Sequence, residues 1–150
     1  MVNSRVKGSS FERAVATCLL EELGLKFQRD LEQWRSGDRG DLLCVDMDFP
    51  AVIECKAYAK GTSAKPVWWD QVCKAATAAN KWPLLVYKYD RMPWRWRMPA
   101  AVLTALGRPV NYVGAREGAD LDWGYAVEMD TRTAMTIIRE VLADAALRNR

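Results

Sequence analysis

Histidine is absent from all 150 residues of the chain. Its absence removes the usual general base, the Ser-His and Cys-His nucleophile systems and most transition-metal sites. A bound metal ion would have to be held by oxygen ligands, which favours magnesium or manganese. The cysteines also lack the paired C-x-x-C spacing of zinc and iron-sulfur sites, so we expect buried free thiols. They are Cys18, Cys44, Cys55 and Cys73.

Long apolar runs are missing as well. No stretch approaches the roughly 20 apolar residues that span a bilayer, and the start MVNSRVKGSSFER lacks the apolar centre of a signal peptide. We therefore expect a cytoplasmic protein that does not bind a membrane. The length and the absence of repeats or low-complexity linkers predict one domain over residues 1–150.

The positive charge is concentrated in the middle of the chain. The net charge is only +3, but residues 54–97 contain nine Lys and Arg against three Asp and Glu. The flanking segments, 1–53 and 98–150, are slightly acidic. This distribution indicates a patch for a polyanion, although a solvated basic surface without a partner would explain it equally well.

Apolar periodicity and turn residues predict an α/β fold. We expect a helix over 10–23, capped by Ser9 or Ser10, and a second helix over 67–82 that ends at Pro83. Asp130 or Thr131 would cap a C-terminal helix. Extended segments are expected at 26–34, 42–45, 51–58, 84–89, 110–113 and 125–129, with a hairpin turn at 46–50 and a short helix at 100–106.

The apolar stretch AVIECKAY, residues 51–58, contains two opposite charges. Side chains alternate along a strand, so Glu54 and Lys56 share one face. Asp41 opens the preceding strand, and pairing across the turn could bring its carboxylate beside Glu54. Two adjacent carboxylates raise at least one pKa unless a cation lies between them, and magnesium is the expected cation.

The spacing D-(12 residues)-E-x-K, from Asp41 to Lys56, resembles the PD-(D/E)xK nuclease superfamily. Four motifs extend the resemblance to archaeal-type Holliday junction resolvases and their phage relatives: KGSSFER, RSGDRGDLL, IECK and WDQV, in this order. The resemblance covers roughly residues 5–90. It implies a restriction-endonuclease-like αβββαβ core with a mixed central sheet flanked by helices, followed by residues 91–150 as an extension with a C-terminal helix.

The resemblance also implies the site residues. The catalytic set would be Glu12, Ser36, Asp41, Glu54, Lys56 and Gln71. Asp41, Glu54 and Glu12 would bind Mg²⁺, for which Mn²⁺ would substitute. This chain has Gly-Asp where the motif has Pro-Asp, so Asp38 is a rival to Asp41. We favour Asp41 because the apolar LLCV follows it directly.

The reaction implied is metal-assisted hydrolysis of phosphodiester bonds in four-way junction DNA. Lys56 would hold the attacking water or offset charge on the transition state, and Glu12 would orient a water. A junction has two-fold character, so a homodimer is expected. If the chain is phage-encoded, it would act in the host cytoplasm. The expected DNA contacts are Arg5, Lys7, Arg35, Arg39, Lys60, Lys65, Arg95 and Arg97.

Simpler interpretations remain for these residues. Glu12 stands three residues after Ser9 and could complete a capping box. Asp41 could cap a turn, and Glu54 with Lys56 could form a cross-strand or intrastrand ion pair.

The roles of the tryptophans and the function of the protein also have alternative interpretations. We expect Trp68, Trp69 and Trp82 to lie mostly in the core. The run Trp94–Arg97 could stack on unpaired bases or pack on the sheet. The protein could also be another nuclease of the superfamily, cutting in restriction, repair or flap processing, or an inactive DNA-binding module.

Overall fold

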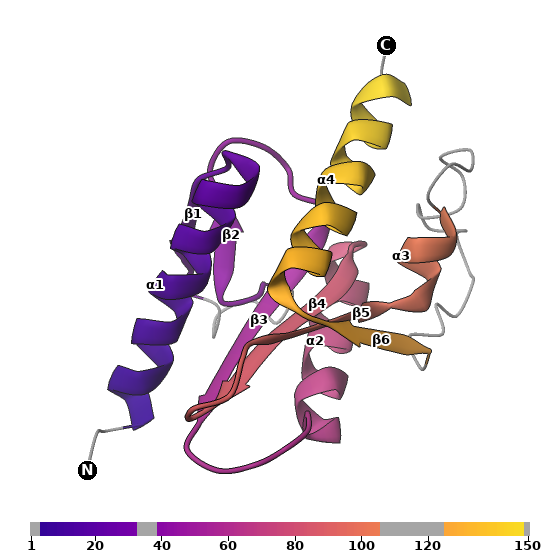
Figure 1. Ribbon diagram of the computed structural model, residues 1–150. Helices are drawn as coiled ribbons and strands as arrows, with labels where there is room; N and C mark the ends of the chain where they lie inside the picture. Colours follow the sequence, from indigo (N-terminus) through magenta and orange to yellow (C-terminus); the bar gives the residue numbers. More distant parts are fainter. Residues whose placement is uncertain (1–3, 33–38, 106–124, 149–150) are drawn as a thin grey trace.

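The computed structural model describes residues 4–32, 39–105 and 125–148 of the chain (Figure 1). Their order along the chain begins α1-β1-β2-β3-α2-β4, which confirms the expected αβββαβ core. The elements are α1 (Ser4–Leu23), β1 (Phe27–Arg29), β2 (Leu42–Cys44), β3 (Ala51–Tyr58), α2 (Pro66–Ala79), β4 (Trp82–Tyr89), β5 (Arg95–Pro99), α3 (Ala100–Ala105), β6 (Ala126–Met129) and α4 (Thr131–Arg148).

The strands form a six-stranded mixed sheet in the order β1-β2-β3-β4-β5-β6. The two long central strands, β3 and β4, run parallel and pair from Ala51 opposite Trp82 to Tyr58 opposite Tyr89. A parallel pair needs a crossover, and α2 supplies it. All other neighbours are antiparallel. The proline-bracketed segment after β4 thus forms β5, and β5 and β6 widen the sheet beyond the region of resemblance.

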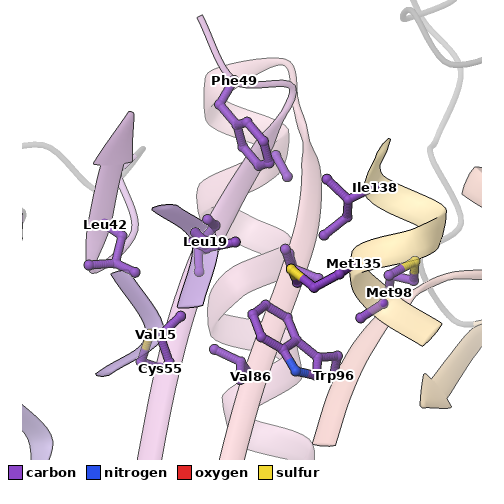
Figure 2. Close-up of a cluster of buried hydrophobic side chains, with 14 of the residues drawn as sticks. Val15, Leu19, Leu42, Phe49, Cys55, Val86, Trp96, Met98, Met135 and Ile138 are labelled. Atoms are coloured by element: carbon purple, nitrogen blue, oxygen red, sulfur yellow. The ribbon is translucent and has the colours of Figure 1, made fainter. Parts of the chain in front are cut away.

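Helices cover both faces of this sheet. Helices α1 and α4 lie on one face and α2 lies on the other (Figure 1). Under α1 and α4, the side chains of Val15, Leu19, Trp96, Met135 and Ile138 are fully or almost fully buried (Figure 2). The period of two along β3 therefore sends Ile53 and Cys55 into this core and the side chains between them toward α2.

The tryptophan run after β4 has a structural role on this face. Trp96 has no exposed surface, and its Nε1 donates to Thr131 Oγ1 at 2.9 Å. Trp94 packs edge-on against Phe11 with ring centroids 5.1 Å apart. Trp96 therefore cannot stack on an unpaired base, whereas Trp94 is half-buried and its contact with DNA stays a prediction. Trp68, Trp69 and Trp82 are buried, as expected.

Two helix boundaries differ from the sequence-based expectation. Helix α1 begins at Ser4, so Ser9 lies inside the helix and the capping box with Glu12 does not form. Helix α2 ends at Ala79 because Asn80 adopts a left-handed conformation (φ 55°, ψ 45°), which asparagine tolerates well. Trp82 and Pro83 are therefore the first two residues of β4.

Other expectations have mixed outcomes. The extended segment at 26–34 forms a strand only over Phe27–Arg29. The cap of the last helix is confirmed, since the Thr133 N–H donates to Asp130 Oδ1 at 2.8 Å. The four cysteines are free thiols, with Cys55 buried and the others half-buried. The strand expected at 110–113 lies outside the described residues. Within the described ranges, no helix is both long and apolar enough to span a bilayer.

Candidate active site

Three of the predicted site residues meet on the face of the sheet that α2 covers. Glu54 and Lys56 lie on the same side of β3, and Gln71 faces them from the second turn of α2. The Lys56 Nζ lies 2.8 Å from Glu54 Oε1 and donates to Gln71 Oε1 at 3.2 Å. The intrastrand ion pair considered as an alternative therefore forms, and it is buried, since Glu54 is only 4% exposed. The lysine is held between a strand and a helix.

Asp41 is fastened to β3 beside Glu54. Its N–H donates to the Ile53 carbonyl oxygen at 2.8 Å, and its Oδ2 accepts a hydrogen bond from the Cys55 N–H at 2.7 Å. These bonds reach β3 on either side of Glu54, and Asp41 is 5% exposed. The hairpin therefore brings the two carboxylates together as predicted. The rival Asp38 lies outside the described residues, as does Ser36.

The two buried carboxylates, Asp41 and Glu54, repel each other and shift the pKa values of the site. The pKa of Glu54 is raised to about 7, first by burial and then by the charge of Asp41; Lys56 opposes this rise and Glu12 adds to it. Burial acts to lower the pKa of Lys56, but the charge and hydrogen bond of Glu54 and the charge of Asp41 outweigh it and raise the pKa. Lys56 is therefore cationic at neutral pH.

Helix α1 brings Glu12 to the site, where it is held by a residue that the sequence did not single out. The Arg29 Nε donates to Glu12 Oε2, and both side chains are largely buried, with 29% and 16% exposed. Arg29 ends β1 and pairs with Leu42, the residue after Asp41. Nothing in the local pattern around Arg29 could have revealed this contact, because it joins elements 17 residues apart.

Asp30 is a second residue that sequence reasoning missed. It is 8% exposed, and its N–H donates to the Asp41 carbonyl oxygen at 2.9 Å. Its Oδ1 accepts a hydrogen bond from the Glu32 N–H at 2.9 Å. The backbone of Asp30 therefore holds the Asp41 strand end in place, while its carboxylate fixes the turn that follows β1.

The predicted metal ligands are not gathered into a ready-made cluster. Among the described residues, no group of three Cys, Asp or Glu side chains is arranged to hold a metal ion. Each of the three predicted carboxylates instead has a protein donor: the Cys55 N–H for Asp41, Lys56 for Glu54 and Arg29 for Glu12. The donor chemistry still fits Mg²⁺ or Mn²⁺, because a divalent cation would relieve the repulsion between Asp41 and Glu54, which adds to the effect of burial in raising the pKa of Glu54.

Residues 3–116 match the family described as "Phage putative PDDEXK endonuclease". The chain belongs to this family. Membership confirms the resemblance to the PD-(D/E)xK nucleases, extends it past residue 90 and makes the protein a nuclease of this superfamily.

The chain is also similar to a solved structure of Archaeoglobus fulgidus Hjc, a Holliday junction resolvase from an archaeal hyperthermophile. The similarity covers 84% of this chain and 85% of that chain, at 17% sequence identity and a TM-score of 0.46. The comparison with curated proteins gives no match.

The basic residues expected to contact DNA have different environments in this endonuclease. Lys60 and Arg95 are exposed, whereas Arg97 is half-buried over the Trp69 ring and lies 3.3 Å from Glu128 Oε1. Lys7 pairs with Asp90 at 2.5 Å, Arg39 lies 3.9 Å from Asp30 Oδ2, and the Lys65 Nζ lies over Tyr58 and Trp68. Arg5 lies in the first turns of α1, and Arg35 lies outside the described residues.

The Gly-Asp departure from the motif has a steric explanation. A Cβ atom at position 40 would overlap the backbone oxygen of Ile53 on the neighbouring strand. The absence of a side chain thus allows the chain to approach β3 closely enough for Asp41 to bond it.

We predict that Gly40→Ala destabilises the protein by about 1–3 kcal/mol, as overpacking does, because the overlap is with backbone that cannot rotate away. The rate of DNA cleavage should also fall, because the overlap would displace the neighbouring Asp41. Chemical unfolding measures the first effect. Gly8→Ala is the matched control, because a Cβ at Gly8 meets nothing within 4 Å. Equal stability of the two variants would show that β3 does not restrict position 40.

A second prediction concerns the Arg29–Glu12 pair. Arg29→Gln should lower the free energy of unfolding by about 1–3 kcal/mol in EDTA, because it leaves the Glu12 carboxylate partly buried without its charged donor. Arg139→Gln is the control: Arg139 also pairs with a glutamate of α1, Glu22, but both side chains are 47% exposed. Exposed pairs contribute at most about 1 kcal/mol, so this variant should change little. Equal losses in both variants would contradict the special position of Arg29.

Proposed function

We propose that the protein is a Mg²⁺-dependent, structure-selective DNA endonuclease that resolves four-way junctions as a homodimer. The observation that carries the hydrolytic part is the contact of Lys56 with both Glu54 and Gln71 beside the buried Asp41. The junction specificity is supported by the four motifs that follow, in order, the pattern of archaeal-type resolvases.

Asp41 and Glu54 would hold the Mg²⁺ ion, and Glu12 would be a third carboxylate. When bound, the ion would polarise the scissile phosphate and lower the pKa of the attacking water. The protein contributes a site from which bulk water is largely excluded, because both carboxylates are about 95% buried. Charges act more strongly there than in water.

Lys56 supplies the positive charge that faces the reacting phosphate. A lysine has three N–H donors, and Glu54 and Gln71 each take one. The third can donate to a phosphate oxygen or to the attacking water. Because the ammonium is held by β3 and α2 at once, it is already oriented when the transition state forms, which is the arrangement that stabilises developing charge most effectively.

Two active sites are needed for the proposed reaction. A four-way junction has two-fold character, and its resolution requires one cut in each of two strands. A homodimer with one site per subunit meets this requirement. The basic central segment, residues 54–97, would contribute to the junction-binding surface.

The test is cleavage of a mobile four-way junction with Mg²⁺, alongside a matched duplex, a flap and a single strand. The wild-type protein should make symmetric nicks across the junction at least about tenfold faster than it cuts duplex, and Asp41→Asn should remove them. Comparable cleavage of plain duplex would instead favour another nuclease role within the superfamily. Binding without cleavage in Mg²⁺ and Mn²⁺, unchanged by Asp41→Ala, would mean an inactive DNA-binding module.

A further inference from the structure

An exposed aromatic ring lies beside the catalytic lysine. Tyr58 ends β3, two residues after Lys56, and the alternation of side chains puts both on the face that α2 covers. Tyr58 is 41% exposed, although most of the rings on this face are buried. Two residues of strand span about 7 Å, so the ring is within about two nucleotides of the proposed reacting phosphate at 3.4 Å per nucleotide.

The ring rests on a rigid base. Tyr58 stacks on Trp68 with centroids 5.0 Å apart and an interplanar angle of 16°. Trp68 is 4% exposed and belongs to α2, one turn before Gln71. Below it, Tyr89 lies 6.1 Å from Trp68 and donates its hydroxyl hydrogen to the Ser63 carbonyl oxygen at 2.7 Å. One face of Tyr58 is therefore covered by protein, and its exposed surface can receive a planar partner.

Lys65 adds a positive charge beside this stack. Its Nζ lies 5.1 Å from the Tyr58 ring centroid and 5.5 Å from that of Trp68. The outer face of Tyr58 is the face turned away from Trp68. An ammonium on that face would lie much farther from the Trp68 centroid than the 5.5 Å observed, so Lys65 leaves the outer face uncovered. The charge lies within 5.5 Å of both ring centroids, close enough for a phosphate attached to a stacked base to reach it.

The surroundings of the ring favour an anion. Lys65 is the N-cap residue of α2, which has no side-chain cap and no acidic residue in its first turn. The positive end of the helix dipole therefore adds to the lysine charge. The exposed Lys60 lies in the same connection between β3 and α2. Charge and an exposed ring together match a nucleotide better than they match an apolar protein surface.

We propose that Tyr58, Trp68 and Lys65 form a stacking platform that receives an unpaired base of the DNA substrate next to the scissile phosphate. This inference rests on the proposed function and names how the same site recognises its substrate. A base inside an intact duplex is already stacked on both sides and cannot lie on Tyr58, whereas a base at a branch point can. The Tyr58 platform would thus favour branched or distorted DNA over perfect duplex close to the point of cleavage. Lys65 would bind the phosphate of the stacked nucleotide.

The test uses full-length protein and junctions that carry 2-aminopurine, a fluorescent base, at each position within three nucleotides of the cut. In EDTA, wild type and Tyr58→Phe should change the fluorescence of one such base on binding, and Tyr58→Leu should not. With Mg²⁺, Tyr58→Leu should cleave the junction about 5- to 100-fold less efficiently, the range expected for loss of one base–aromatic stack. Tyr58→Phe should stay within about twofold of wild type, because it keeps the ring.

The matched control is Tyr125→Leu, which removes another exposed tyrosine, 76% exposed, just before β6. It should behave as wild type in both measurements. Lys65→Met should make binding less salt-dependent by about one phosphate contact. Thermal unfolding checks that each variant is folded, and Tyr58→Phe keeps the test valid if Tyr58→Leu unfolds.

The possible outcomes separate this inference from the proposed function. If Tyr58→Leu retains the fluorescence change and the cleavage rate, the platform does not bind a base and the inference is wrong. If Tyr58→Leu alters only the sedimentation coefficient, the ring belongs to a contact between two copies of the chain, which also overturns it. If wild type cuts duplex as fast as junctions, the junction specificity fails, while the fluorescence change on a single strand still decides whether Tyr58 stacks on a base.

Discussion

Lys56→Met is expected to slow junction cleavage on the order of 100- to 1,000-fold, as removal of one preorganised transition-state donor does in other enzymes. The lysine ammonium is the cation that both Glu54 and Gln71 hold, and its removal leaves the reacting phosphate without it. Methionine preserves the length and apolar stem of the side chain, so packing against α2 should survive. Single-turnover cleavage of a labelled junction measures the rate, and binding in EDTA shows whether affinity is kept.

Lys81→Met is the matched control for this prediction. Lys81 also pairs with a carboxylate, Asp48, at 2.7 Å. It lies just before the first residue of β4, whereas Lys56 lies beside Tyr87, near the other end of that strand. We expect Lys81→Met to cleave at the wild-type rate. If Lys56→Met keeps more than about a tenth of the wild-type rate while remaining folded, Lys56 has no direct part in the reaction.

Glu54→Gln is expected to stabilise the metal-free protein while it abolishes cleavage. Burial and Asp41 raise the pKa of Glu54 from 4.5 to about 7, so the folded state binds this proton more tightly than the unfolded state does. Wild-type stability should therefore fall as the pH rises from about 4.5 to about 7 and remain low above it, by up to about 3 kcal/mol. Glutamine does not titrate in this range, so the stability of the variant should not fall with rising pH in this way.

Urea unfolding in EDTA at pH 5, 6, 7 and 8 measures this difference. Glu22→Gln removes an exposed, ion-paired glutamate of α1 and should follow the wild-type curve within about 1 kcal/mol. Millimolar Mg²⁺ should then raise the melting temperature of wild type at pH 8 but not that of Glu54→Gln, because a ligand that binds only the folded state stabilises it. Parallel curves of stability against pH for wild type and Glu54→Gln would mean that the pKa of Glu54 is not raised in the folded state.

Some of the site could be predicted because it depends on short-range geometry. The two-residue period of a strand places Glu54 and Lys56 on one face whatever surrounds them. The turn between β2 and β3 brings Asp41 to the same place, since a hairpin pairs nearby residues. The αβββαβ order followed from alternating periodicity in the same way.

Other features could not be predicted because they depend on which elements pack together. The sequence allows the run Trp94–Arg97 either to stack on bases or to pack on the sheet, and only the position of α4 decides that Trp96 is core and not a base-stacking surface. The end of α2 was misplaced because Asn80, not the more conspicuous Pro83, stops the helix. Arg29 and Asp30 lie in a weakly patterned segment and acquire their roles only from contacts with α1 and with Asp41.

The sequence by itself determined the chemistry available to this protein: no histidine, a buried strand with Glu54 and Lys56 on one side, and Asp41 before it. These properties follow from residue identity and from backbone periodicity, which act over a few residues. Only the tertiary structure decided that Gln71 meets Lys56, that Arg29 holds Glu12 and that Tyr58 lies exposed on Trp68. Each of these contacts joins separate segments, and their meeting depends on how the sheet and its helices bury their apolar faces.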